Sequence, residues 1–126
     1  MKQKPISSLK KELWSAFASW VKKKGRGRCF TCDRTRLSGK KYHAGHFIKA
    51  SVCGLALYFN PDNVKPQCAY CNIFLDGNQY EFGRRLGTEK VAELYELRQA
   101  SKNLQWTRKD YEAKIAYYKH LVPTGK

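Results

Sequence analysis

The sequence predicts an α+β domain with a small β-containing centre between N-terminal and C-terminal helices. Three features of the 126-residue chain predict this arrangement. Apolar residues recur with helical spacing at both ends, two short aromatic and aliphatic segments lie in the middle, and two Cys-x-x-Cys pairs enclose that middle. We therefore expect a single domain over residues 1–126, divided into a basic N-terminal helix or arm (1–28), a cysteine-bound core (29–80) and C-terminal helices (81–126).

The first helix is predicted over residues 8–24. Ser7 or Ser8 is expected to cap its start, and Gly25 is expected to end it. Its apolar residues recur at intervals of three and four, which is the spacing of an amphipathic helix, and they are Leu9, Leu13, Ala16, Phe17, Trp20 and Val21.

The chain beyond Cys71 has a helical pattern that is interrupted at Gly77 and Gly87. Thr88 predicts the start of one helix, and residues 107–110 have the spacing of a capping box for another. We interpret the apolar residues of both helices as core.

Two short strands are predicted between the cysteine pairs, over residues 42–48 and 55–59. Both segments are rich in aromatic and aliphatic residues and are bounded by turn formers. Residues 60–63, Asn-Pro-Asp-Asn, have the composition of a turn.

The chain is strongly basic, with 25 Lys and Arg residues against 10 Asp and Glu residues and a formal net charge of +15. Residues 1–28 contain nine of the basic residues and one of the acidic ones. A polyanion such as a nucleic-acid backbone is the expected partner, although basic runs at helix ends can also be solvated surface. The candidate phosphate-binding residues are Lys10, Lys11, Lys22, Lys23, Lys24, Arg26, Arg28 and Lys49.

No apolar run approaches the ~18 residues that a membrane-spanning helix needs. The residues after Met1 lack the apolar segment of a signal peptide. We therefore expect no membrane association and a cytoplasmic location. The five cysteines would stay reduced there, and a cluster of them is expected to bind metal instead of forming disulfides.

The two cysteine pairs, Cys29 with Cys32 and Cys68 with Cys71, have the spacing of a structural zinc site. Each two-residue spacer lets one turn present two thiolates, and two such pairs complete a tetrahedron around Zn²⁺. A thioredoxin-like redox pair is the alternative, but it would need a single pair at a helix start in a βαβ unit. Cys53 lies outside both pairs and is expected to fill apolar space. All-cysteine zinc sites are closed, so any chemistry must come from other residues.

Polar residues around the cysteines follow a nuclease-like order, with His46 on a predicted strand, Asn63 in the following loop and Asn72 directly after the last cysteine. This order resembles the HNH nuclease motif, and in particular the HNN variant of phage endonuclease VII. The chain is also similar to the phage NinG (Rap) family of recombination endonucleases. That resemblance covers about residues 29–97 and is based on Cys29-x-x-Cys32, Ala44-Gly45-His46-Phe47, Phe59-Asn60-x-x-Asn63-Val64, Gln67-Cys68-x-x-Cys71-Asn72 and Gly77-Asn78.

The resemblance implies a zinc-stapled ββα-metal core of the HNH (His-Me finger) type that hydrolyses phosphodiesters with one divalent ion. It assigns His46 as the general base, and a neutral imidazole with a reference pKa of ~6.5 suits proton removal from water near pH 7. Asn63 is expected to brace the loop and the His46 ring by hydrogen bonds. Asn72 matches the family position of an ion ligand, and Asp76, one helical turn later, can point the same way.

His43 departs from the pattern of the relatives, several of which carry Asp at this position. Other HNH enzymes place the strand ligand directly before the base, where this chain has Gly45. A His ligand would favour Mn²⁺, Co²⁺ or Ni²⁺ over Mg²⁺. Strict strand alternation would put His43 and His46 on opposite faces, whereas a bulge at Gly45 would bring both rings to one face.

These observations together predict a metal-dependent DNA endonuclease with a structural Zn²⁺ and a catalytic Mg²⁺ or Mn²⁺. The NinG resemblance implies branched substrates such as Holliday junctions and D-loops, 5′-phosphate and 3′-hydroxyl products, and a phage or prophage origin. Paired cuts on a junction would require a homodimer. Two alternatives stay open, namely a non-catalytic zinc module that binds nucleic acid and an inactive HNH relative that acts with protein partners.

Overall fold

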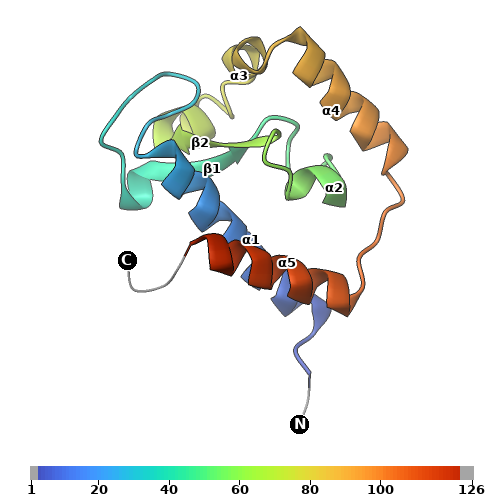
Figure 1. Ribbon diagram of the computed structural model, residues 1–126. Coiled ribbons are helices and arrows are strands. Elements are labelled where there is room, and N and C mark those ends of the chain that lie inside the picture. Colours follow the sequence, from blue (N-terminus) through green and yellow to red (C-terminus); the bar gives the residue numbers. More distant parts are fainter. Residues whose placement is uncertain (1–2, 123–126) are drawn as a thin grey trace.

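The computed structural model describes residues 3–122, which form helices around a two-stranded antiparallel sheet. The sheet and a short helix, α2, lie between two pairs of helices, α1 with α5 and α3 with α4 (Figure 1). The α+β class predicted from the sequence is confirmed. In chain order the elements are α1 (Ile6–Gly25), the 3₁₀ turn η1 (Gly39–Lys41), β1 (Tyr42–His46), α2 (Leu55–Tyr58), β2 (Val64–Cys68), the π-helical turn η2 (Tyr70–Phe74), α3 (Gln79–Leu86), α4 (Thr88–Ala100) and α5 (Arg108–Leu121).

Helix α1 contains the whole predicted segment 8–24 but begins earlier than expected. The predicted serine cap is wrong, because Pro5 occupies the cap position and no side chain caps the helix. Proline is favourable at a helix start because the first N–H groups have no partner within the helix. At the other end, Arg26 adopts a left-handed conformation with φ 51°. The last turn carries three lysines, which stabilise the negative end of the helix dipole.

Strands β1 and β2 pair in a regular register, from Tyr42 opposite Cys68 to His46 opposite Val64. The first predicted strand is confirmed, although β1 ends at His46 and not at residue 48. The second predicted strand, over residues 55–59, is wrong, because these residues form α2 and the turn that follows it, with Leu57 fully buried. A short apolar run does not distinguish a buried strand from a buried helical turn.

Pro66 makes the second strand difficult to predict from the sequence, because proline is uncommon inside strands. The Pro66 carbonyl accepts a hydrogen bond from the Phe30 N–H (2.7 Å), so it points away from β1. The nitrogen and carbonyl of one strand residue point to the same side, and the N–H that proline lacks would therefore also face away from β1. The sheet loses no hydrogen bond to this proline.

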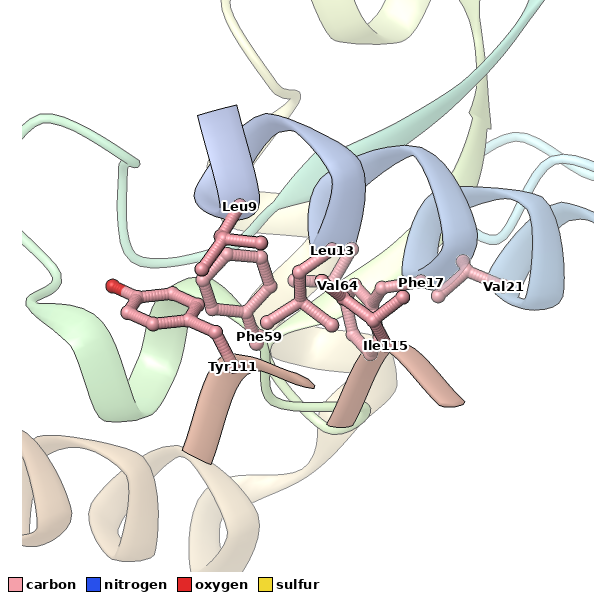
Figure 2. Packing of buried hydrophobic residues seen from close by; sticks show 8 residues of the cluster. All are labelled: Leu9, Leu13, Phe17, Val21, Phe59, Val64, Tyr111 and Ile115. Carbon is pink, nitrogen blue, oxygen red and sulfur yellow. The ribbon is translucent and has the colours of Figure 1, made fainter. Parts of the chain in front are cut away.

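The larger apolar core lies between α1 and α5. Figure 2 shows the side chains along one face of α1 directed toward α5. Helix α1 is thus part of the core and not a detachable arm. The buried residues of this cluster are Leu9, Leu13, Phe17, Val21, Phe59, Val64, Tyr111 and Ile115.

A second apolar cluster connects α2 and the segment that follows β1 to α3 and α4. Cys53 is 1% exposed there and fills apolar space, as predicted. The buried residues of this cluster are Phe47, Ile48, Cys53, Leu57, Phe82 and Leu94.

The C-terminal helices begin where the sequence predicts. Helix α4 starts at Thr88. Thr107 caps α5 with the predicted capping box, in which its hydroxyl accepts from the Asp110 N–H (3.2 Å) and the Asp110 carboxylate accepts from the Thr107 N–H (2.8 Å). Within residues 3–122, no helix combines the length and apolar character needed to cross a membrane.

Candidate metal centre and active site

The four paired cysteines converge beside the hairpin, two from the loop after α1 and two from the end of β2 and η2. Their sulfur atoms all lie within 4.8 Å of one another, and the Cys32 and Cys68 Sγ atoms are 3.7 Å apart. In a tetrahedral site with Zn–S bonds of about 2.3 Å, the sulfurs are about 3.8 Å apart. The four cysteines can therefore hold one zinc ion, as their spacing in the sequence predicts.

Hydrogen-bond donors surround the sulfur atoms. The Cys68 sulfur accepts from the Cys71 N–H (3.3 Å) and from the Arg34 guanidinium (3.6 Å). The Asn78 amide donates to the Cys71 sulfur (3.6 Å). Such contacts stabilise the thiolate form, which is the form that binds zinc.

His46 lies at the end of β1, where its ring contacts Trp14 of α1 and Tyr58 of α2. The His46 and Trp14 rings are stacked, with centroids 5.1 Å apart and planes inclined by 17°. The His46 Nε2 atom lies 3.0 Å from the Tyr58 carbonyl oxygen. A carbonyl only accepts hydrogen bonds, so Nε2 carries the proton and Nδ1 keeps its lone pair.

Burial also controls the charge of the His46 ring. It lowers the pKa of His46 below the ordinary value of 6.5, and the hydrogen bond to Tyr58 opposes this shift only in part. The ring is therefore neutral near pH 7. A neutral imidazole with one nitrogen held and the other free to accept a proton meets the requirements for a general base.

Asn63 is fully buried and holds the loop that connects the two strands. Its Oδ1 accepts from the Ile48 N–H (2.8 Å), and its Nδ2 donates to the carbonyls of Ile48 and Leu57 (3.1 Å each). The expected hydrogen bond from Asn63 to the His46 ring is absent, because the carbonyl of Tyr58 holds the ring instead. Asn63 thus acts on His46 indirectly, through α2.

His43 lies on the opposite face of β1 from His46. The register shows no bulge at Gly45, so strict alternation applies. The His43 Nε2 atom donates to the Lys40 carbonyl (2.9 Å), and its Nδ1 is 3.0 Å from Nδ2 of Asn72. The structure brings together the predicted ion ligands His43 and Asn72 and separates both from His46 by the strand itself.

Asp76 does not join these two residues. The predicted one-turn relation to Asn72 is wrong, because η2 is a π-helix that ends at Phe74 and Asp76 follows it with a positive φ of 50°. The Asp76 side chain is 81% exposed and forms an ion pair with Lys49.

Gln67 is fully buried and connects the zinc centre to the face of β1 that carries His43. Its Nε2 donates to the Thr31 hydroxyl (3.0 Å) and to the Gly77 carbonyl (2.9 Å). The Thr31 hydroxyl lies in turn 3.4 Å from the Cys29 sulfur. Of the buried side-chain oxygen and nitrogen atoms in residues 3–122, Gln67 Oε1 alone has no hydrogen-bond partner.

Sequence analysis did not identify Trp14, Tyr58 or Gln67 as site residues. The sequence signal for Trp14 is that it is an aromatic residue beside the apolar stripe of α1. Tyr58 contributes a backbone atom, which no sequence pattern marks. Gln67 is marked in the sequence only as one position of the family motif.

The predicted phosphate-binding residues have different surroundings. Lys10 Nζ lies 4.9 Å from the centre of the Tyr58 ring, near His46. Lys24 lies over the Trp20 ring near the other end of α1 (4.7 Å). Arg28 and Lys49 are paired with Asp33 and Asp76, whereas within residues 3–122 no ion pair is formed by Lys10, Lys11, Lys22, Lys23, Lys24 or Arg26.

Comparison with known proteins gives one family. No curated protein and no solved structure matches the chain. A family model described as Bacteriophage Lambda NinG protein matches residues 1–125. Because this match covers nearly the whole sequence, the chain belongs to the NinG family.

Proposed function

We propose that this protein is a metal-dependent DNA endonuclease in which His46 is the general base. The observation that supports the proposal best is the setting of the His46 ring. Its Nε2 is held by the Tyr58 carbonyl, its pKa is lowered by burial, and its Nδ1 keeps a lone pair that can accept a proton from water.

Hydrolysis of a phosphodiester also needs positive charge near the phosphoryl oxygens and the departing 3′-oxygen. A bound Mg²⁺ or Mn²⁺ supplies this as a Lewis acid. His43 and Asn72 are the residues that would hold the ion, because the His43 Nδ1 lone pair and the Asn72 side-chain amide, which now donates to it (3.0 Å), lie side by side. Water and substrate oxygens would complete its coordination, as is usual for these ions.

The position of His43 and His46 on opposite faces of β1 agrees with the HNH order. In that order the strand ligand directly precedes the base, and adjacent strand residues also point to opposite faces. A separation of three residues keeps the same alternation. β1 pairs with β2 on one side only, which leaves its other edge without a strand neighbour within residues 3–122.

Charge and family support the proposed substrate class. A net charge of +15 favours a phosphate backbone. Membership in the NinG family adds branched recombination intermediates, which is the substrate class that the resemblance to recombination endonucleases implies. Paired cuts on such a junction would be made by a homodimer.

Cleavage of plasmid DNA and of a synthetic four-way junction, with Mg²⁺ or Mn²⁺ added, tests the proposal. Wild-type protein should cut in a metal-dependent manner. His46→Ala should lose about 10²- to 10⁴-fold in rate, the usual contribution of a general base. Its DNA affinity should persist, because lysines and arginines bind the phosphates.

His120→Ala is the matched control, since His120 is exposed on α5 and should keep the wild-type rate. If His46→Ala cuts as fast as wild type, the assignment of the base is wrong. DNA binding by the wild type without any metal-dependent cutting would indicate a non-catalytic zinc module or an inactive HNH relative.

A further inference from the structure

The orientation of the Gln67 side-chain amide is fixed by its donors. Nε2 has two hydrogens, and both are used, one toward the Thr31 hydroxyl and one toward the Gly77 carbonyl. The Gly77 carbonyl only accepts, so the nitrogen cannot exchange places with the oxygen. Oε1 must therefore point the other way, over Gly45 of β1.

At Gly45 two amide oxygens face one small space. A methyl group added to Gly45 would overlap Gln67 Oε1 and would lie 2.9 Å from Asn72 Oδ1. Both atoms are acceptors, and Gln67 Oε1 has no partner although Gln67 is fully buried. A buried acceptor without a donor destabilises the structure that contains it.

Rotation of the Asn72 amide by half a turn would give this oxygen a donor. Nδ2 would then face Gln67 Oε1, and Oδ1 would face Nδ1 of His43. His43 Nε2 donates to the Lys40 carbonyl, so Nδ1 carries a lone pair. The rotated amide would thus place two lone pairs next to each other, an arrangement that a cation bound by both atoms would stabilise.

The spacing fits such a cation. The His43 Nδ1 atom and the Asn72 amide atom that faces it are 3.0 Å apart. Neighbouring ligands of an octahedral ion with bonds of about 2.1 Å are also about 3.0 Å apart. The present hydrogen-bonded distance is thus close to the separation of two neighbouring ligands of one ion, and little movement would be needed for both residues to bind it.

We propose that Gln67 is a positioning residue for the candidate divalent-ion site, and this rests on the proposed function. When the ion binds, the Asn72 amide rotates so that Oδ1 faces the ion and Nδ2 donates to Gln67 Oε1. Ion binding then satisfies an acceptor that is otherwise buried without a partner. Because Thr31 connects Gln67 to Cys29, the zinc centre holds Gln67 in the required place.

Titration of the zinc-loaded protein with Mn²⁺, followed by electron paramagnetic resonance without DNA, tests this. Gln67→Met should weaken Mn²⁺ binding about 10- to 100-fold, the usual effect of a contact behind a ligand. In an Asn72→Ala background the same substitution should have no further effect. Leu13→Ala is the control for general loosening, because Leu13 is fully buried in the core between α1 and α5, and it should affect Mn²⁺ binding much less than Gln67→Met does.

Nuclear magnetic resonance with Mg²⁺ reports the amide orientation directly. The Asn72 side-chain amide protons should gain a nuclear Overhauser contact with the Gly45 α-protons on adding Mg²⁺, and Gln67→Met should not. The inference would be overturned if Gln67→Met bound Mn²⁺ as tightly as wild type, or if Gln67→Met weakened Mn²⁺ binding as much in the Asn72→Ala background as in the wild type. It would also be overturned if the wild type bound no Mn²⁺. Plasmid cleavage by the wild type tests the proposed function separately, because it does not depend on the role of Gln67.

Discussion

At the scale of single residues, Gly45 shows how closely the candidate site is packed. Its φ is not in the left-handed region, so the position needs glycine for space and not for conformational freedom. Gly45→Ala should lower the free energy of unfolding by about 1–3 kcal/mol, the usual effect of overpacking a buried position. Denaturant unfolding measures this, and an unchanged midpoint would show that Gln67 and Asn72 can move away at little cost.

The pKa of His46 gives a prediction for the pH dependence of cleavage. Because burial lowers this pKa below 6.5, Nδ1 stays unprotonated at pH 7, and the rate should fall only as the pH drops through the lowered pKa. Trp14→Ala would expose the ring and raise the pKa, so the acidic limb of the pH–rate profile should move to higher pH. Trp20→Ala removes an aromatic residue of the same helix that does not contact His46 and should leave the limb in place. An identical limb in both variants would argue against His46 as the titrating base.

At the scale of secondary-structure elements, local patterns predicted the elements whose signals are local. The apolar stripe of α1 and the capping box at Thr107 are properties of adjacent turns, and both predictions hold. Strand β2 was missed because proline is tolerated in a strand only where its nitrogen faces away from the partner strand, and no local pattern shows which way Pro66 faces.

The candidate site shows the same difference between features with local sequence signals and features that depend on distant parts of the chain. The cysteine cluster and the adjacency of His43 and Asn72 followed from spacing and motif order. The contacts of Tyr58 with His46 and of Gln67 with Thr31 depend on backbone atoms and on pairing across the fold. Sequence reasoning therefore predicted which side chains lie close together better than it predicted the contacts that orient them.

The position of α1 in the core changes how its basic residues should be tested, because its deletion would also remove buried apolar residues. Replacing Lys10, Lys11 and Lys23, which are exposed, by Gln should preserve the melting temperature. It should also weaken DNA binding and flatten the plot of log K against log salt by about 0.9 for each lost phosphate contact. Lys102→Gln with Lys109→Gln, near the α4–α5 connection, is the control. An unchanged slope in the α1 variant would place the phosphate contacts elsewhere.

At the scale of the whole molecule, a zinc ion held by the four cysteines would fasten the loop after α1 to the hairpin and η2. A domain of this size has a modest core, so metal binding contributes directly to folding. Purified protein should contain about one Zn²⁺ per chain, and Cys68→Ser should be largely unfolded by circular dichroism. Cys53→Ser, which alters a cysteine outside the cluster, should keep its zinc. A zinc-free protein with a full cooperative melt would contradict this role.

The packing of α1 against α5 has a consequence for synthesis on the ribosome. Helix α1 ends at Gly25 and α5 begins at Arg108, so the apolar face of α1 emerges long before its partner has been translated. The nascent chain can assemble its cysteine cluster once Cys71 has emerged, but the core in Figure 2 must wait for α5. Products that terminate between these points would carry an uncovered apolar helix, which makes them natural clients for chaperones and proteases.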